Sequence, residues 1–478
     1  MSSVPQSEPD FPAEDDAAEP ATLPPAAALT EAAAAAEMAE RFGEHFRWDY
    51  DRGFFRVYNV GAGIWTEDFS GRVARYARSI ARSAWQRAAG KEAVKHATRI
   101  SSAAGIESVL RLARSEPGVP IRATELDADP WLLNVKNGVV DLRTGRLFRH
   151  TPAGLMTKLA PVNFVPTATC PMWDDFLVKI TDGRSALAIY LQRLSGMFLT
   201  GDVSVQEFYI FHGCGANGKS VFLDTISGIV GDYGGIAPES LLTARPQSNH
   251  PTDLASVVGK RLVIGSETES GASLRLQLVK RLTGDSTLTA RFMRQDFFTF
   301  PRTFKFVLVT NNRPHIPERS EATWRRIRLV PFDVVIPANE RDPRLLAKLR
   351  EEWPGILAWM VRGCADWRRD GLATPAEVAE ATSAYAAEQD DIGEFVSALC
   401  AVGAGQFTSR DRIYKTYSDW PGGRRKMQRS DFYEALRRIQ GVSDDQRRVC
   451  GKPVRGFSGI GLTNLSDALR DLQGGYCE

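Results

Sequence analysis

The chain has 478 residues, 43% of them hydrophobic and 25% charged, with 60 Lys and Arg against 58 Asp and Glu. These fractions are ordinary for globular proteins and exclude fibrous and wholly disordered classes. Six single cysteines without a C-x-x-C pair argue against a zinc ribbon or a disulfide framework, and favour a reducing compartment. The sequence has no secretory signal and no apolar run of roughly 18 residues, so we expect a cytoplasmic protein without membrane contact.

The small net charge of +2 hides an uneven distribution. Residues 1–44 contain ten acids and one base, a net charge of −9, which leaves +11 on the rest of the chain. We therefore expect an acidic, Ala- and Pro-rich disordered tail over residues 1–44, with a helix left open for its Ala-rich stretch 26–42.

The remaining patterns predict an α/β fold in several domains. Residues 45–200 mix short strand-like and helical stretches and are expected to form an N-terminal α/β domain. Residues 201–338 alternate short apolar strands with helices, which is typical of a three-layer α/β domain. Residues 339–388 are expected to be helices packed on that core. Residues 389–478 show three short helical patterns followed by a Gly-rich basic segment.

One loop has the composition of a phosphate-binding site. Residues 213–220 read G-C-G-A-N-G-K-S and fit G-x-x-x-x-G-K-[ST] at every fixed position. The preceding segment 208–211 is strand-like and residues 221–230 are helix-like, so the helix dipole would point at a bound anion. We predict that the lysine reaches the phosphates and the serine hydroxyl ligates Mg²⁺. The predicted nucleotide-binding residues are Gly213, Cys214, Gly215, Ala216, Asn217, Gly218, Lys219, Ser220 and Val221.

Further polar residues follow two apolar strand patterns. Glu267 and Glu269 end the strand-like segment that begins at Arg261, and in extended geometry they point to the same side. They would hold Mg²⁺ and activate the attacking water, or they are a solvated strand end. Asn311 follows the strand-like segment 304–310 and would bond the γ-phosphate, although Asn-Asn-Arg-Pro is also good turn chemistry.

The segment 324–332, Trp-Arg-Arg-Ile-Arg-Leu-Val-Pro-Phe, places arginines on a strand pattern whose apolar residues belong to the core. An arginine supplied to a neighbouring subunit's nucleotide would stabilise transition-state charge. A solvated basic face is the alternative.

The order and spacing of these motifs over residues 207–332 resemble the superfamily 3 helicases of phages, plasmids and large DNA viruses, which have an AAA+-type core. The segments Leu126–Asn134 and Asn137–Leu142 look like the domain that precedes the helicase in phage and plasmid primase-helicases, and Trp353–Trp359 resembles the helical segment after the core. The resemblance covers about residues 45–460 and predicts an AAA+-like P-loop NTPase core with an N-terminal α/β domain and a C-terminal winged helix.

The resemblance also implies roles for individual residues. Lys219 and Ser220 match the Walker A residues, Glu267 and Glu269 the Walker B acids, and Asn311 the sensor asparagine. Arg326 is our choice for the arginine finger, with Arg325 as an alternative. The cofactors implied are ATP and Mg²⁺, with Ser220 and Glu267 as metal ligands. Thr268 separates two acids that are often adjacent in related helicases, so which glutamate is the base stays open. The extra motif of these helicases matches Lys280, Gly284, Asp285 and Arg291.

Two regions are expected to contact DNA. The resemblance implies a β-hairpin just before the sensor strand, and segments 287–293 and 297–300 alternate like its two strands. Arg294 would contact phosphate at its tip, with Arg291 and Lys280 nearby. Packing is the favoured role for Phe297 and Phe298, and base stacking the alternative.

The second region is basic: segment 405–455 has thirteen Lys and Arg against six Asp and Glu. Its helix, helix and basic hairpin pattern looks like a winged helix that grips DNA, and a charged solvated face is the alternative. The candidate DNA contacts here are Arg437, Arg438, Arg447 and Arg448.

The sequence therefore predicts an ATP-dependent DNA helicase of phage, plasmid or mobile-element replication in a bacterial host. Its expected partners are single-stranded and forked DNA, further copies of itself in a ring, by analogy a hexamer, and a separate primase or replication initiator. Two alternatives are an origin-binding initiator that uses ATP as a switch and the helicase part of a primase-helicase. Residues 1–44 are too few for a primase domain, so we do not expect priming by this chain.

Overall fold

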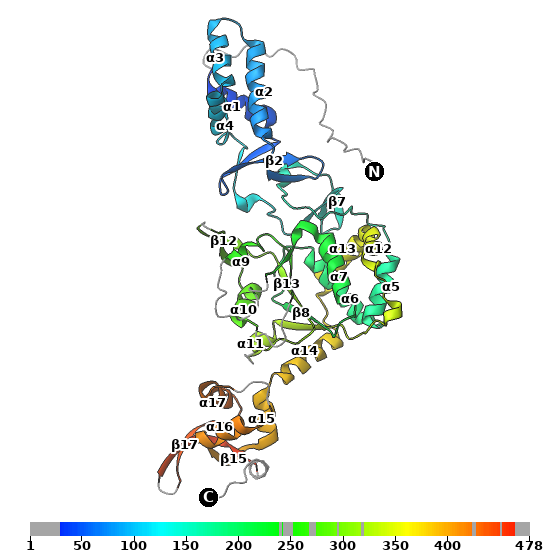
Figure 1. The fold of residues 1–478 in the computed structure, drawn as a ribbon, viewed down its shortest axis with the longest axis vertical. Helices are drawn as coiled ribbons and strands as arrows, with labels where there is room; N and C mark the ends of the chain where they lie inside the picture. The colour runs from blue at the N-terminus through cyan, green and yellow to red at the C-terminus, as the bar shows by residue number, and fades with distance from the viewer. Residues whose placement is uncertain are drawn as a thin grey trace, which may run out of the picture. The chain divides into compact units, whose positions relative to one another are not determined.

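The computed structural model describes residues 29–238, 241, 252–266, 274–293, 296–316, 320–422, 427–449 and 452–463. It divides into two compact units (Figure 1). The N-terminal unit contains the chain up to Asp129 with Asn134–Val139 and Phe148–Leu159. The core unit contains Pro130–Leu133, Val140–Leu147 and the residues from Ala160 onward. The expected N-terminal domain over residues 45–200 is therefore wrong in its end, because residues 160–200 belong to the core unit.

The N-terminal unit packs four helices and a four-stranded sheet around one hydrophobic core. Strands β1 to β3 form an antiparallel meander, and β4 pairs in parallel with β1. The helices are α1 (Glu31–Phe42), α2 (Arg72–Arg87), α3 (Lys91–Ser101) and α4 (Ala103–Ala113). The strands are β1 (Phe46–Asp49), β2 (Phe54–Asn59), β3 (Ile64–Glu67) and β4 (Pro120–Ile121).

Helix α1 corrects the expected limit of the acidic tail. The Thr30 hydroxyl accepts a hydrogen bond from the Ala33 N–H at 3.1 Å and caps the helix. Ala35 and Met38 are fully buried in the core of the N-terminal unit. Because this face is apolar, residues 31–42 fold with the unit despite their acidic outer side. The expectation of a disordered tail up to residue 44 is wrong for residues 31–42, where the helix left open for the Ala-rich stretch 26–42 is present. Residues 1–28 lie outside the described residues.

A small three-stranded sheet, of order β5-β6-β7, follows these elements in the chain. Its strands are β5 (Leu132–Val135), β6 (Gly138–Asp141) and β7 (Arg146–Phe148). Short 3₁₀ helices occur at η2 (Ala123–Glu125), η3 (Pro152–Gly154), η4 (Gly231–Tyr233) and η5 (Ala338–Glu340).

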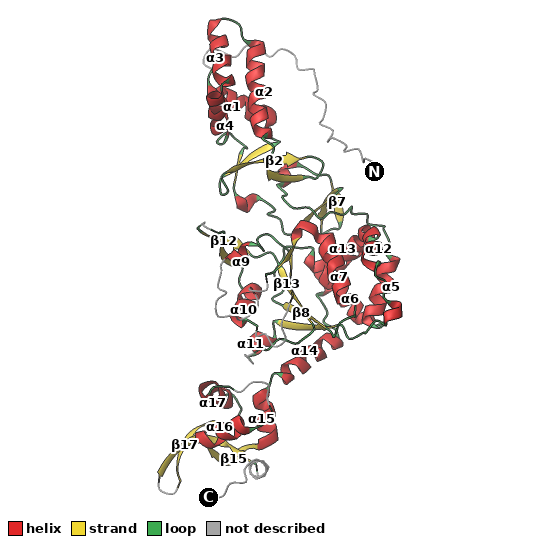
Figure 2. Cartoon of the chain, in the orientation of Figure 1, coloured by secondary structure: helices red, strands yellow, loops and turns green. Residues whose placement is uncertain are grey.

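The core unit is centred on a parallel five-stranded sheet of order β14-β8-β13-β10-β9. Helices lie on both sides of it, with α10 on one side and α6, α7 and α13 on the other (Figure 2). The strands are β8 (Phe208–His212), β9 (Gly234–Ile236), β10 (Leu262–Ser266), β13 (Lys305–Thr310) and β14 (Ile327–Pro331). The helices between them are α7 (Lys219–Val230), α9 (Thr252–Ala255), α10 (Leu276–Gly284) and α11 (Glu321–Trp324). The expected mixed α/β architecture is confirmed.

Alternate side chains of β8 supply the two faces of this sheet. Phe208 and Ile210 join the cluster that includes α10, whereas Phe211 lies 6.2 Å, between ring centroids, from Phe222 of α7. All these side chains are fully buried. A parallel strand covered on both faces needs a continuous apolar run, which is why β8 reads Phe-Tyr-Ile-Phe.

Residues 160–200 belong to the core unit because their helices bury large side chains in it. Trp173 of α5 (Pro171–Thr181) stacks on Phe222, with ring centroids 5.4 Å apart. The Glu352 carboxylate accepts hydrogen bonds from the Met172 and Trp173 N–H groups at 3.1 and 2.9 Å. Helix α6 (Ser185–Phe198) packs against α13 (Trp353–Asp370), preceded by α12 (Leu345–Glu351).

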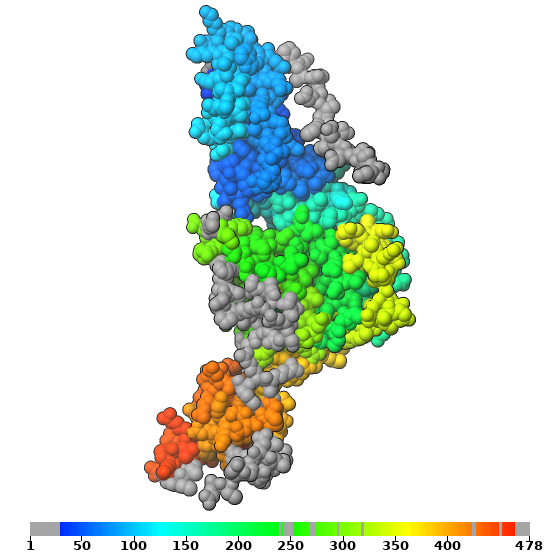
Figure 3. Space-filling model, viewed as in Figure 1, coloured from blue at the N-terminus to red at the C-terminus, as the bar shows by residue number. Residues whose placement is uncertain are grey.

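The remaining chain continues through α14 (Ala376–Glu388) to a helical and β-structured C-terminal part with its own core. Its helices are α15 (Asp391–Leu399), α16 (Arg410–Asp419) and α17 (Arg429–Arg437). Its antiparallel sheet has the order β15-β17-β16, with β15 (Cys400–Ser409), β16 (Ser443–Val449) and β17 (Lys452–Leu462). The β16–β17 hairpin extends away from the helices of this part (Figures 1 and 3).

Candidate functional site

The Gly-rich loop joins β8 to α7 at the carboxyl edge of the core sheet. Three of its residues have positive φ: Gly215 at +95°, Ala216 at +51° and Gly218 at +80°. A Cβ added at Gly213 would lie 2.2 Å from the Phe332 carbonyl oxygen, so only glycine fits there. The motif's glycines are thus required by backbone geometry and by close approach.

The backbone of this loop presents unused donors. Within the described part of the chain, the N–H groups of residues 214–218 and of Ser220 donate no hydrogen bond. Such orphan donors at a helix start, joined by the positive end of the helix dipole, form an anion-binding concavity. Cys214, Ala216 and Ser220 are exposed, which leaves this side of the loop open. The loop therefore fits a polyphosphate.

Lys219 is the first residue of α7 and lies under the loop. Its Nζ donates hydrogen bonds to the Gly213 and Thr310 carbonyl oxygens, both at 2.9 Å, and to Asn311 Oδ1 at 3.0 Å. The side chain is 4% exposed, and this burial lowers the pKa of the Lys219 ammonium. An ammonium group with only neutral partners and little water is suited to a strong anionic ligand.

Asn217 fixes the loop to the end of β14. Its Nδ2 donates to the Phe332 carbonyl at 3.0 Å, and its Oδ1 accepts from the Lys219 N–H at 3.3 Å. The Ile336 N–H adds a bond to the Ala216 carbonyl at 2.8 Å. Sequence reasoning missed these anchors, because Asn217 occupies an unspecified position of the motif, and Phe332 and Ile336 lie more than a hundred residues from the loop.

Asn311 meets Lys219 because of the strand order. Strand β13 lies between β8 and β10, and Thr310 is paired with His212 in register. The residue after Thr310 therefore emerges beside the loop. The structure thus brings together the predicted sensor asparagine and the predicted Walker A lysine.

The predicted Walker B acids, Glu267 and Glu269, lie outside the described residues. Strand β10 ends just before them at Ser266, which is paired with Val309 of β13. Of the two predicted metal ligands only Ser220 is described, and it is exposed beside Lys219. Among the described residues, no three His, Cys, Asp or Glu side chains gather in a metal-binding group.

The predicted arginine finger lies at the opposite edge of the sheet. On β14, Ile327 is paired with Phe208 and Pro331 with His212, so Arg326 precedes the amino edge. Its guanidinium donates to the Ala322 carbonyl, and a Cβ added at Gly284 would lie 3.5 Å from its Nη2. Its Nε is buried without a hydrogen-bond partner among the described residues. Arg326 therefore does not reach Lys219 of its own chain. The alternative finger, Arg325, is exposed.

The expected hairpin is present as β11 (Thr287–Arg291) and β12 (Phe297–Pro301), which pair in antiparallel register. Arg291 lies over the ring of Phe297, 5.3 Å from its centroid. Phe298 stacks on Phe292 at 5.0 Å, as expected for packing. Phe297 is 61% exposed, so the expectation that it packs is wrong. Arg294 lies outside the described residues.

The four positions matched to the extra motif lie on α10, directly after it and at the end of β11. Gly284 ends α10, and Asp285 pairs with Arg281 at 3.6 Å. Lys280 lies on the same helix, one turn before Gly284. The structure therefore brings Gly284 close to Arg326.

Most of the predicted C-terminal DNA contacts are paired with acids. Arg437 donates to Asp444 at 2.8 Å, Arg447 to Asp445 at 2.8 Å, and Arg438 lies 3.9 Å from Glu434. The hydrogen bonds from Arg410 and Arg437 lower the pKa of the Asp444 carboxyl. Arg448 is exposed and has no partner within the described residues. These exposed pairs are weak and leave the arginines accessible to phosphate.

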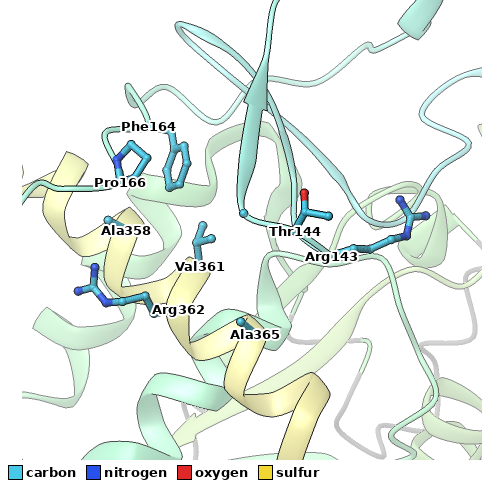
Figure 4. Close-up of a pocket in the computed structure, with 9 residues that line it drawn as sticks. Arg143, Thr144, Phe164, Pro166, Ala358, Val361, Arg362 and Ala365 are labelled. Atoms are coloured by element: carbon cyan, nitrogen blue, oxygen red, sulfur yellow. The ribbon is translucent and has the colours of Figure 1, made fainter.

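A separate cavity of about 250 Å³ lies in the core unit beside α13. Figure 4 shows Phe164 and Val361 on its walls, with Arg143 and Arg362 at its rim. Its walls are mostly apolar, and none of its lining residues belongs to the loop around Lys219. It is therefore distinct from the candidate nucleotide site.

Comparison with protein families gives two matching segments. A family model described as "D5 N terminal like" matches residues 35–182, and one described as "Family of unknown function (DUF5906)" matches residues 211–326. The second segment contains the loop, β10, the hairpin and Arg326. Neither match spans half of the chain.

Viral proteins with related sequences carry the name "Putative helicase". One from Acanthamoeba polyphaga mimivirus is 26% identical over 294 residues, which are 57% of this chain and 30% of that protein. One from Frog virus 3 (isolate Goorha) is 22% identical over 382 residues, which are 62% of this chain and 39% of that protein. The matches thus span about a third of the length of these relatives.

The fold resembles the apo structure of the NrS-1 C terminal region, with a TM-score of 0.50 and 11% identity. The superposition covers 89% of this chain and 99% of that chain. At this identity the likeness concerns the fold alone.

No described helix is both long enough and apolar enough to span a membrane.

Proposed function

We propose that this chain is an ATP-dependent DNA helicase of superfamily 3 that acts in phage, plasmid or mobile-element replication. The observation that carries the proposal is the Lys219 ammonium, buried beneath a loop of unused N–H donors and hydrogen-bonded to Asn311. The similarity to viral proteins named as helicases supports the same function. The bacterial host implied by the sequence stays a prediction.

The loop and Lys219 would bind the phosphates of ATP, and Ser220 with Glu267 would hold Mg²⁺. Bound Mg²⁺-ATP supplies the free energy of phosphoryl transfer and a metal that neutralises developing charge. Lys219 would exchange its carbonyl partners for phosphate oxygens, while Asn311 stays within reach of the γ-phosphate. One of Glu267 and Glu269 would orient the attacking water.

The position of Arg326 supports an assembly in which sites form between subunits. Because Arg326 lies at the sheet edge opposite its own loop, it would act on the nucleotide of a neighbouring chain. Repeating this head-to-tail contact around an axis closes a ring. We propose a homo-oligomeric ring, by analogy a hexamer.

The hairpin β11–β12 would contact single-stranded DNA inside this ring. Exposed Phe297 offers a ring face to a base, and Arg291 and Arg294 offer cations to phosphate. Coupling of hydrolysis to hairpin movement would translocate the strand, in the 3′→5′ direction by resemblance.

The test is ATP hydrolysis and fork unwinding by the full chain and by Lys219→Ala. Loss of the buried ammonium is expected to reduce hydrolysis by roughly a hundredfold or more, since a phosphate-binding cation stabilises transition-state charge. Lys348→Ala, which removes a lysine paired with Asp342, is the control and should hydrolyse ATP normally. Equal hydrolysis by wild type and Lys219→Ala would refute the site.

A replication initiator that uses ATP as a switch is the second candidate. Arg448 favours it: this residue is exposed in the projecting β16–β17 hairpin and has no partner among the described residues, and such a hairpin can bind duplex phosphates. If the wild-type protein hydrolyses ATP but does not separate DNA strands, this result would support the initiator function and overturn the proposed helicase function.

A further inference from the structure

The outer face of α2 in the N-terminal unit is strongly basic. Its sixteen residues contain five arginines and no acid, in the sequence Arg-Val-Ala-Arg-Tyr-Ala-Arg-Ser-Ile-Ala-Arg-Ser-Ala-Trp-Gln-Arg. The longer segment 71–114 has ten Lys and Arg against two Asp and Glu, a net charge of 10 − 2 = +8. A helix without a single carboxylate on any face is not the usual solvated helix with balanced charge.

The arginines are not spread around this helix. At 100° per residue, Arg75, Arg78, Arg82 and Trp85 fall within an arc of about 80°. All four are exposed, and the buried side of α2, which includes Ile80, faces the core of the unit. The helix therefore presents one continuous stripe of cations that ends in an indole.

The two arginines in the middle of the stripe have no acidic partner among the residues that the structure describes. Arg75 bonds the Ser70 carbonyl at 2.7 Å, and Arg87, away from the stripe, pairs with Glu37 at 2.7 Å. Arg78 and Arg82 have no hydrogen bond or ion pair within the described part of the chain. Like charges at i and i+4 destabilise a helix, so this pair opposes rather than aids folding.

The chemistry of the stripe fits an unpaired nucleic acid strand. Unpartnered guanidinium groups form bidentate bonds with phosphate. Trp85 is 46% exposed, and an exposed indole gains from bases only where they are unstacked, as in a single strand. Duplex DNA would use the arginines alone, because its bases are stacked on one another, and the carboxylates of an acidic protein would pair with the arginines without engaging the indole.

We propose that the outer face of α2, with Arg78, Arg82 and Trp85 at its centre, is a binding surface for single-stranded nucleic acid. It is separate from the hairpin β11–β12. The proposal rests on the proposed function only for the source of the strand, namely DNA opened at a replication fork.

The experiment measures binding of the full chain, without nucleotide, to a fluorescent single-stranded oligonucleotide and to a duplex of the same sequence over a range of salt concentrations. Arg78→Ala/Arg82→Ala is expected to weaken single-strand binding by roughly tenfold and to reduce the salt slope by about 1.4, at ~0.7 per phosphate contact. Trp85→Ala should weaken single-strand binding about fivefold or more and leave duplex binding unchanged.

Arg111→Ala/Arg149→Ala is the matched control, since it removes two exposed arginines of the same unit outside α2. It should leave single-strand affinity within about twofold of wild type. Circular dichroism checks that each variant is folded.

Equal losses in the control and in the α2 double variant would overturn the proposal, as would an unchanged affinity in the double variant. A Trp85→Ala variant that loses duplex and single-strand binding equally would also overturn it. ATP hydrolysis without DNA is measured in a separate assay. If wild type does not hydrolyse ATP, the proposed function is refuted, but the test of single-strand binding by α2 remains valid.

Discussion

A mixture of Lys219→Ala and Arg326→Ala chains is expected to recover ATP hydrolysis that neither variant has alone. On β14, four residue steps separate Ile327 from Pro331, which is about 13 Å along the sheet at ~3.3 Å per residue. Arg326 precedes this strand, and the loop follows His212 at its far edge. Arg326 of one chain and Lys219 of the same chain therefore cannot serve one nucleotide.

The size of the recovery follows from counting interfaces. An interface is intact when its loop comes from an Arg326→Ala chain, which retains Lys219, and its arginine comes from a Lys219→Ala chain, which retains Arg326. In an equal mixture with random assembly, about a quarter of the interfaces meet this condition. Alone, Lys219→Ala should lose roughly a hundredfold or more in rate. Arg326→Ala alone should lose roughly a thousandfold, as for other arginine fingers. The assay is steady-state phosphate release at fixed total protein as the ratio of the two variants is varied.

The result that would refute this reasoning is a mixture no more active than its components, although subunit exchange is demonstrated by fluorescence energy transfer. Arg325→Ala is the matched control, because Arg325 is the exposed neighbour of Arg326. If Arg325→Ala shows the complementation and Arg326→Ala does not, the finger is Arg325. Wild-type rates in Arg326→Ala alone would show that this residue has no role in hydrolysis.

Two further predictions concern stability. Glu352→Ala should destabilise the core unit by about 2 kcal/mol, because it removes the acceptor for two N–H groups at the start of α5. The control Glu351→Ala removes the exposed neighbouring carboxylate and should leave stability unchanged. Equal melting temperatures in the two variants would contradict this prediction. Burial lowers the pKa of Lys305 well below 10.5, so the folded state binds fewer protons than the unfolded chain between the two values, and stability should rise with pH across that window. Urea unfolding midpoints should show this rise in wild type but less of it in Lys305→Met; parallel pH curves would contradict the assignment.

Local sequence was sufficient to locate the Gly-rich loop and the lysine of the candidate nucleotide site. The positions of the glycines follow from backbone conformations that the motif requires, and a phosphate-binding lysine can be recognised from spacing alone. The contact between Lys219 and Asn311 is different, because 92 residues separate them and no local pattern reports the insertion of β13 between β8 and β10.

Domain limits were predicted less well, for a related reason. Helix α5 has the same type of apolar pattern whether it packs on its neighbours in sequence or on a distant sheet. Only the structure shows Trp173 stacked on Phe222 and the α5 start bonded to Glu352, 180 residues away. Likewise, the acidic residues of α1 suggested a tail, while its buried Ala35 and Met38 tie it to the N-terminal unit.

The charge distribution shows the same division. The sequence by itself determined how many cations each segment carries and where the Gly-rich loop lies, since both depend on residue type and spacing. The tertiary structure decided which cations are free: Asp444 pairs with Arg410 of α16 and Arg437 of α17, whereas Arg78 and Arg82 of α2 have no partner within the described residues. Whether a charge is paired depends on where other segments bring their carboxylates, and that is fixed only when the chain is folded.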